Sequence, residues 1–174
     1  MRGLQDKVVV VAGAAPGNIG AAAAVRLAEE GAKVLAADYN ADAAQAVAEA
    51  ITGNGGAATG HAFDITDEGS FKGLIDAAVS RYGRLDGLFT VAADLSPRTF
   101  GSDSDVTDVS LEVWQRTLQV SLTGYMYGIR HAMPIMIRQG AGSIVNTMSS
   151  SVWMGESNHV SYQSAKSGLI GFSP

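Results

Sequence analysis

Apolar residues gather in five short runs along the chain, and longer amphipathic stretches separate these runs. The runs are rich in valine, isoleucine and alanine and are bounded by glycine or charged residues, which is typical of strands buried on both faces of a parallel sheet. They cover residues 7–12, 33–38, 57–63, 86–91 and 142–149. The stretches between them carry apolar residues at intervals of three or four, which predicts helices. These helices cover residues 21–31, 41–52, 67–83 and 110–139.

The regular alternation of strand and helix predicts an α/β fold with a right-handed, doubly wound parallel sheet of strand order 3-2-1-4-5. In such a sheet a ligand binds where the strand order reverses, between the first and fourth strands. Residues 94–107 have little periodicity and predict an irregular loop. Pro134 is expected to kink or interrupt the long helix, and another helix is expected to begin near Ser161.

Composition narrows the class of protein. A length of 174 residues predicts one domain, and 47% hydrophobic with 17% charged residues is ordinary for a globular core. The net charge of −5 argues against a nucleic-acid surface. The absence of cysteine excludes disulfides, thiolate metal sites and cysteine nucleophiles, and cytoplasm is the default location. No stretch approaches membrane-spanning length, so we expect no membrane partner, and we expect no metal site.

A glycine-rich turn joins the first strand to the first helix. Gly13, Gly17 and Gly20 lie where side chains would block the approach of a ligand, and the helix N-terminus favours an anion. Asn18 is placed to cap the helix. The turn therefore predicts a site for a dinucleotide pyrophosphate; the alternative is a tight turn that binds nothing.

Asp38 ends the second strand, eighteen residues after Gly20. A carboxylate at this distance can accept from the ribose 2′-OH of NAD and repel the 2′-phosphate of NADP. Residues 14–19 and 39–45 contain no basic side chain to neutralise that phosphate. NAD is therefore predicted over NADP, and the alternative is a solvated aspartate at a strand end.

Tyr162 and Lys166 lie four residues apart, so on a helix they share one face. A nearby cation stabilises a phenolate and lowers the tyrosine pKa from its reference value of about 10, which would make Tyr162 a general acid and base. Ser149 lies at the end of the fifth strand, thirteen residues before Tyr162. The alternative is a serine-rich loop before a helix with a chance tyrosine and lysine pair.

These residues resemble the active site of the short-chain dehydrogenase/reductase family, in its classical branch. The resemblance implies a single NAD(P)-binding Rossmann-like domain over residues 1–174. It implies that Ser149 holds the substrate oxygen, that Tyr162 exchanges the proton, and that Lys166 lowers the tyrosine pKa and binds the nicotinamide ribose. The cofactor residues that follow from the motifs and the resemblance are Gly13, Gly17, Asn18, Ile19, Gly20, Asp38, Asp64, Ile65, Ala92, Ala93, Tyr162 and Lys166.

The sequence departs from the family pattern at three places. The glycine turn is one residue longer, since its glycines fall at relative positions 0, 4 and 7 instead of 0, 4 and 6. The family's Asn-Asn-Ala-Gly appears as Thr-Val-Ala-Ala at residues 90–93, which removes both asparagines. The family's asparagine, which relays protons through water to the catalytic lysine, corresponds to Ser121. This shorter side chain could still hold a water, or it is only a serine in a helix. The resemblance also implies that Asp64, followed by Ile65, contacts the adenine ring. The alternative is that Asp64 is a turn residue.

The chain ends at Pro174, whereas the resemblance implies further C-terminal strands and a lid over the substrate, so the fifth strand would be an open edge. Whether the chain is a fragment, part of a longer polypeptide or naturally truncated stays open. The resemblance also implies a homo-oligomer, a dimer or tetramer. Trp153 and Met154 form either an apolar wall of the substrate pocket or loop anchors packed on the core.

The sequence therefore predicts an NAD-dependent oxidoreductase that acts on a small, apolar secondary alcohol or ketone. A dinucleotide-binding module without turnover is the alternative, motivated by the altered turn and the lost asparagines. A scaffold or dimerisation unit that binds no ligand is a third reading.

Overall fold

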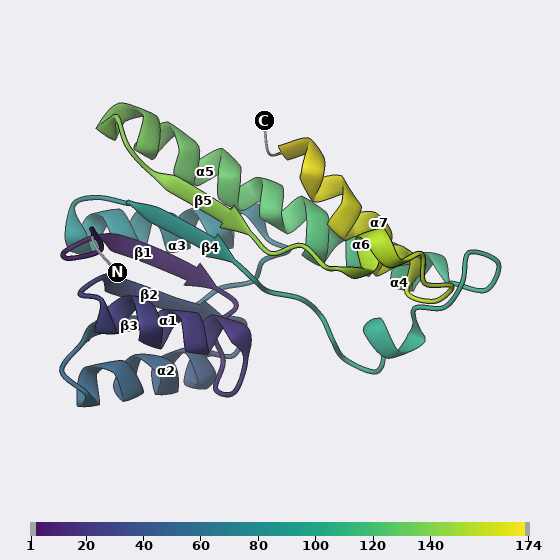
Figure 1. Cartoon of the computed structure of the whole chain (residues 1–174), viewed down its shortest axis with the longest axis horizontal. Coiled ribbons are helices and arrows are strands. Elements are labelled where there is room, and N and C mark those ends of the chain that lie inside the picture. Colours follow the sequence, from purple (N-terminus) through teal and green to yellow (C-terminus); the bar gives the residue numbers. More distant parts are fainter. Residues whose placement is uncertain (1–2, 173–174) are drawn as a thin grey trace.

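A five-stranded parallel sheet forms the centre of the molecule (Figure 1). The computed structural model describes residues 3–172. The strand order is β3-β2-β1-β4-β5, which confirms the predicted topology. The strands are β1 (Val8–Ala12), β2 (Lys33–Asp38), β3 (Ala57–Ala62), β4 (Gly87–Thr90) and β5 (Ser143–Asn146).

Helices cover both faces of this sheet (Figure 1). One face carries α1 (Ile19–Glu29) and α2 (Ala41–Gly53), and the other carries α3 (Glu68–Tyr82) and α5 (Gly124–Gln139). Each helix pair contributes to its own hydrophobic cluster, so the protein has one core layer on each side of the sheet.

The valines of β1 divide between these two layers. Val8 and Val10 belong to the layer under α3 and α5, whereas Val9 and Val11 belong to the layer under α1 and α2. This alternation is the period of two that a pleated strand imposes. All four valines are buried, which is why the strand reads as one continuous apolar run.

The long helix predicted over residues 110–139 is one continuous helical stretch, but it is not α-helical throughout. It consists of α4 (Leu111–Leu118), a π-helical segment over Gln119–Thr123, and α5. Of the kink or interruption expected at Pro134, the interruption is wrong, because α5 runs through Pro134 to Gln139. Residues on either side of the proline, Ala132 and Met136, are buried in the core and hold this turn in place.

The remaining elements lie beyond the carboxyl ends of the strands, at the right of Figure 1. They are α4, the short helix α6 (Ser151–Met154), α7 (Val160–Gly168) and a short 3₁₀ turn at Phe100–Ser102. A second 3₁₀ turn, Leu169–Phe172, follows α7. Residues 94–107 are otherwise irregular, as predicted, whereas α6 was not predicted.

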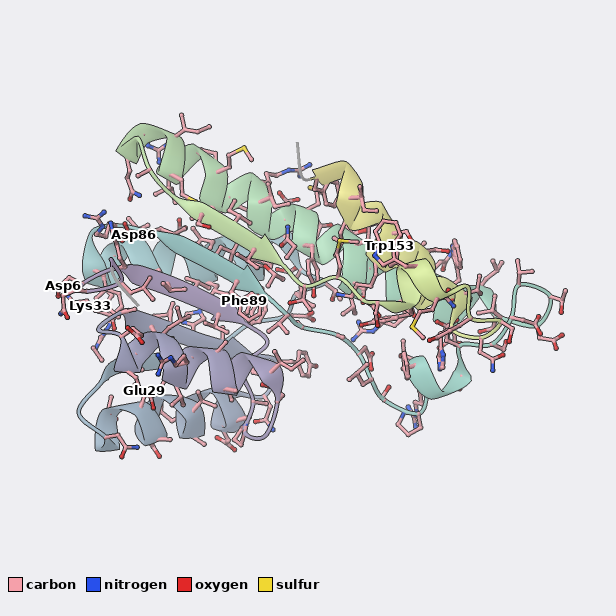
Figure 2. All side chains as sticks on the ribbon, viewed as in Figure 1. Asp6, Glu29, Lys33, Asp86, Phe89 and Trp153 are labelled. Atoms are coloured by element: carbon pink, nitrogen blue, oxygen red, sulfur yellow. The ribbon has the colours of Figure 1, made fainter. Side chains whose placement is uncertain are left out.

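The amino ends of the strands are held by ion pairs. Asp86 accepts hydrogen bonds from Arg84 at 2.6 and 2.7 Å, from Lys7 at 3.2 Å and from the N–H of Val8 at 3.0 Å. Lys33 pairs with Asp6 at 3.4 Å. Figure 2 shows Asp6, Lys33 and Asp86 together at this end and Trp153 at the opposite end. The charged network at the amino ends is therefore structural, and the carboxyl ends are left for a site.

Candidate active site and cofactor cleft

A cleft of about 720 Å³ opens at the carboxyl ends of β1 and β4, where the strand order reverses. This is the position at which an open α/β sheet binds its ligand. The cleft is lined by nine of the twelve predicted cofactor residues: Gly13, Gly17, Asn18, Ile19, Asp38, Asp64, Ile65, Ala92 and Ala93. Gly20, Tyr162 and Lys166 are not among its lining residues.

The glycine turn has the shape of a ligand cradle at one of its three glycines. A Cβ atom on Gly17 would meet no protein atom within 4 Å, so the space beside it is free, and its φ of +83° favours glycine. A Cβ on Gly13 would instead collide with the backbone of Ala92, and one on Gly20 with the carbonyl of Gly13. Gly13 and Gly20 are therefore needed for packing, whereas Gly17 leaves room for a phosphate.

Asn18 closes the turn and begins α1. Its side-chain oxygen accepts from the N–H of Ala21 at 2.8 Å, and its amide donates to the carbonyl of Gly13 at 3.1 Å. The predicted N-cap is confirmed. The first N–H groups of an α-helix have no acceptor within the helix, which makes this helix end suitable for an anion.

Asp38 lies at the end of β2 and lines the cleft, half-buried. One of its oxygens accepts from the N–H of Asn40 at 3.1 Å. The only basic residue that lines the cleft in the described chain is Arg116, which pairs with Asp94 at 3.1 Å. The charge near Asp38 therefore suits a ribose hydroxyl better than a second phosphate.

Asp64 makes the contacts of a turn residue. Its carboxylate accepts from the N–H of Thr66 at 2.8 Å and from the Thr66 hydroxyl at 2.7 Å. Ile65 is buried and packs where a Cβ on Gly124 would lie. Both residues also line the cleft, so the turn orients them toward the space predicted for the adenine.

Lys166 is a fully buried cation on α7, with only 1% of its surface exposed. Its ammonium donates to the Tyr125 hydroxyl and to the Thr147 carbonyl, each at 2.8 Å. No carboxylate of the described residues forms an ion pair with it. Burial without a counter-ion lowers the pKa of Lys166 to about 8.

Tyr162 lies one helical turn before Lys166, as predicted, and the Lys166 nitrogen is 5.6 Å from the centre of its ring. Burial raises the pKa of the Tyr162 phenol above its ordinary value, and a hydrogen bond with Ser149 offsets part of that rise. The expectation that Lys166 lowers this pKa is wrong for the arrangement observed, because the ammonium is directed toward Tyr125 and Thr147. Ser149 also shares a hydrogen bond of 2.8 Å with the Ser151 hydroxyl.

Asp103 holds the first turn of α7, a role the sequence did not reveal. Its carboxylate accepts from the N–H of Ser161 at 3.1 Å, from the Ser161 hydroxyl at 2.8 Å and from the N–H of Tyr162 at 2.9 Å. Asp103 itself is buried. Phe100 packs edge-on against the Tyr162 ring, with centres 5.3 Å apart. The irregular segment thus fixes the position of Tyr162.

Tyr125, for which no role was predicted, hydrogen-bonds to Lys166 directly, whereas in the described chain Ser121 does not. Ser121 is buried in the π-helical segment, and no hydrogen bond joins it to Lys166 among the described residues. Tyr125, four residues later, makes that contact. The spacing of four on one helix places both on the same face, and a hydroxyl in an otherwise apolar stripe was the available signal.

Three buried oxygens at the carboxyl ends of β4 and β5 have no hydrogen-bond partner in the described structure. They belong to the side chains of Thr90, Asn146 and Thr147. Thr90 and Asn146 lie opposite each other in the β4–β5 register, and the Thr147 carbonyl binds Lys166. Unsatisfied polar atoms are costly in a protein interior, so this edge of the sheet has unused capacity to bind a polar group.

The α6 region presents apolar side chains to the outside. Trp153 is 76% exposed and Met154 is 68% exposed. The interpretation of these two residues as loop anchors packed on the core is therefore wrong. An exposed apolar surface beside the site remains compatible with a substrate wall.

Comparison with known proteins identifies the family. The family model described as short chain dehydrogenase matches residues 7–174. This chain belongs to the short-chain dehydrogenase family. The chain is also similar to the D-threitol dehydrogenase of Mycolicibacterium smegmatis, with 36% identity over 172 residues that make up 98% of this chain and 63% of that protein.

Other members of the family show the same degree of similarity. The cis-4-hydroxycyclohexanecarboxylate dehydrogenase of Sinomonas cyclohexanicum is 37% identical over 94% of this chain and 63% of its own length. The crystal structure of an NAD⁺-bound xylitol dehydrogenase superposes with a TM-score of 0.90 and 31% identity, covering 99% of this chain and 64% of that one. The chain thus spans less than two thirds of the length of these relatives.

None of the helices in residues 3–172 is both long and apolar enough to cross a membrane. In the same range, histidine, aspartate and glutamate side chains do not gather in groups of three that could hold a metal ion.

Proposed function

We propose that this protein is an NAD-dependent oxidoreductase that transfers a hydride between the nicotinamide cofactor and a secondary alcohol or ketone. The observation that carries the proposal is the buried Lys166 ammonium, which has no carboxylate partner in the described chain and lies one helical turn from Tyr162. Uncompensated buried charge is costly and is concentrated at functional sites. The family membership supports the same reading.

The residues present suit a dinucleotide. Gly17 and the N-terminus of α1 would hold the pyrophosphate, Asp38 would accept from the adenosine ribose, and Lys166 would donate to the nicotinamide ribose. When bound, the nicotinamide supplies the acceptor or donor of the hydride. The choice of NAD over NADP rests on Asp38 and on the absence of an unpaired basic side chain among the cleft residues described.

In the proposed reaction, Tyr162 moves the proton of the substrate oxygen. For reduction of a ketone, the Tyr162 phenol donates its proton to the oxygen, and for oxidation of an alcohol the phenolate accepts it. Ser149, which already binds Tyr162, would hold the same oxygen and stabilise its developing charge. Because burial raises the pKa of Tyr162, the proton-donating form dominates at neutral pH.

The substrate class follows from the surface beside the site and from the relatives. Similar proteins are named as dehydrogenases of cyclohexanol, of a hydroxycyclohexanecarboxylate and of D-threitol. The exposed Trp153 and Met154 favour the cyclic, apolar alcohols among these.

A dinucleotide-binding module without turnover is the second candidate. One observation favours it: Ser149, Tyr162 and Lys166 do not line the cleft that is lined by nine of the ten other predicted cofactor residues. Two measurements separate the candidates. Fluorescence titration with NADH should show saturable binding in both cases. Steady formation of NADH from NAD and cyclohexanol supports the oxidoreductase, whereas binding without hydride transfer to or from any cyclic alcohol or ketone supports the module.

A further inference from the structure

Lys166 depends on two hydrogen bonds for its place in the interior. Moving an ammonium out of water is expensive unless its N–H groups find acceptors. Here the acceptors are the Thr147 carbonyl and the Tyr125 hydroxyl, both at 2.8 Å. The titratable groups that face the ammonium are Tyr125 on α5 and Tyr162 on α7, both neutral phenols at neutral pH because burial raises their pKa values.

The direction of these hydrogen bonds is fixed by chemistry. An ammonium has three N–H donors and no acceptor, so the Tyr125 oxygen accepts from Lys166. The Tyr125 hydroxyl then donates its own proton to the Ala92 carbonyl, at 3.0 Å. The result is a chain with one polarity, from Lys166 through Tyr125 to Ala92.

This chain ties the lysine to the cofactor cleft. Ala92 follows β4 and lines the cleft. Thr147 follows β5, and its N–H donates to the Thr90 carbonyl at 3.0 Å. Lys166 is therefore anchored at the carboxyl ends of two neighbouring strands. The Lys166 nitrogen lies 4.3 Å from the centre of the Tyr125 ring, so a cation–π contact adds to the hydroxyl contact.

We propose that Tyr125 is a positioning residue, whose buried hydroxyl holds the Lys166 ammonium at the carboxyl end of β4. Two of the three N–H groups are used by Tyr125 and Thr147, which leaves the third for the nicotinamide ribose. The use of the third N–H group for the nicotinamide ribose rests on the proposed function. The position of the Lys166 ammonium against Tyr125 involves only residues of this chain.

Tyr125→Phe tests the inference because it keeps the ring and removes only the hydroxyl. The readout is the ¹⁵Nζ chemical shift of Lys166 against pH, in the 174-residue chain carrying ¹⁵N-lysine and no cofactor. The chain has four lysines, and the Lys166 signal is the one that Lys166→Met removes. Loss of an acceptor to a charged group should lower the Lys166 midpoint by about one pH unit. Affinity for NADH should fall by roughly tenfold.

Tyr127→Phe is the matched control, since it removes a hydroxyl from the same helix two residues away. It should leave both the midpoint and the NADH affinity unchanged. An unchanged Lys166 midpoint in a folded Tyr125→Phe variant would overturn the inference.

A measurement on the wild type keeps the inference testable even where Tyr125→Phe does not fold. In protein carrying ¹³Cζ-tyrosine, the Tyr125 signal should shift at the same pH as the Lys166 ¹⁵Nζ signal, near 8, because the two groups share a hydrogen bond. A Tyr125 signal that is constant through that pH would contradict the inference. Neither readout needs turnover, so an inactive protein with the expected shifts refutes the proposed function alone, and an active protein without them refutes the Tyr125 role alone.

Discussion

At the scale of single residues, burial decides which forms of Tyr162 and Lys166 are present. It raises the pKa of Tyr162 and lowers that of Lys166 to about 8. Both shifts favour the neutral group, as desolvation does in general. At neutral pH the tyrosine is therefore a proton donor and the lysine is still mostly charged. The proposed enzyme is thus prepared for ketone reduction at neutral pH and for alcohol oxidation at higher pH.

The first prediction concerns Ser149. Its hydrogen bond with Tyr162 lowers the pKa of the phenol, against the larger effect of burial. Ser149→Ala should therefore raise this pKa further, and the rise of the alcohol-oxidation rate with pH should move to higher pH. Rate profiles of kcat for the wild type and the variant check this. Profiles that coincide after scaling would show that Ser149 does not act on the Tyr162 ionisation.

The second prediction concerns Asp38. Replacing its carboxylate by Asp38→Ala removes a charged acceptor from the cleft, so NADH affinity should fall by roughly tenfold or more while discrimination against NADPH weakens. Dissociation constants for both cofactors give the result. Asp42→Ala, which removes an exposed acid from the first turn of α2, is the control. Equal affinity of the wild type for NADH and NADPH would contradict the assignment.

At the scale of elements, the position of α7 depends on the irregular segment rather than on the helix itself. His159, the residue before α7, has a left-handed backbone with φ of 61° and makes no side-chain cap. Asp103 supplies the cap from 58 residues away in sequence. The segment 94–107, which has little regular structure, therefore holds the first turn of α7 in position.

Asp103→Ala should consequently affect both stability and the site. Loss of a buried cap with three hydrogen bonds should lower the free energy of unfolding by about 2 kcal/mol. Amide exchange at Ser161 and Tyr162 should become faster, which hydrogen exchange measured by NMR would show. Asp105→Ala is the control in the same segment, since the Asp105 carboxylate accepts from the N–H and the hydroxyl of Thr107 in an exposed turn. If the two variants behave alike, Asp103 does not hold the helix.

Separation along the sequence decides which contacts of the site could be predicted. The Asn18 cap and the positions of Gly17 and Asp38 at the cleft were predictable, because they depend on neighbours in the sequence or on a fixed spacing from the glycine turn. Asp103 and Tyr125 were not, because their contacts with α7 join residues 58 and 41 positions apart. The direction of the Lys166 ammonium was missed for the same reason, since Thr147 and Tyr125 compete with Tyr162 for it.

The secondary structure also divides into elements that the sequence predicts and elements that it does not. The five strands and their order followed from apolar runs and the alternation with helices. The π-helical segment has no signature in the apolar spacing. It occupies Gln119–Thr123, next to Gly124, where a Cβ would collide with Ile65. The π-helical segment therefore lies where the helix packs closely against Ile65, a contact between residues far apart in the sequence.

At the scale of the whole molecule, stability and function lie at opposite ends of the sheet. Asp86 joins the starts of β1 and β4 through Val8, Lys7 and Arg84. Burial of Asp86 would raise its pKa, but hydrogen bonds from Arg84, Val8 and Lys7 outweigh this and lower the pKa to about 2. The carboxylate therefore stabilises the fold without taking part in the site.

Asp86→Asn should lower the free energy of unfolding by about 1 to 2 kcal/mol at neutral pH, a value kept small because Arg84 and Lys7 are partly exposed. The folded pKa lies below the unfolded one, so the stabilisation is complete above about pH 4 and is lost as the pH falls toward 2. Urea unfolding of both proteins across this range checks the prediction. Asp76→Asn, on an exposed pair with Lys72, is the control. A constant difference down to pH 2 would be inconsistent with this role.

In the proposed function, hydride transfer by this protein depends on the phenol of Tyr162. The most direct measurement compares Tyr162→Phe with the wild type, using kcat for a cyclic alcohol or ketone that the wild type turns over and the dissociation constant for NADH. Phenylalanine keeps the ring that packs against Phe100, so the fold and most NADH affinity should persist. The kcat of Tyr162→Phe should fall by roughly 10² to 10⁴. Full activity in Tyr162→Phe would make Tyr162 a structural residue and contradict the account.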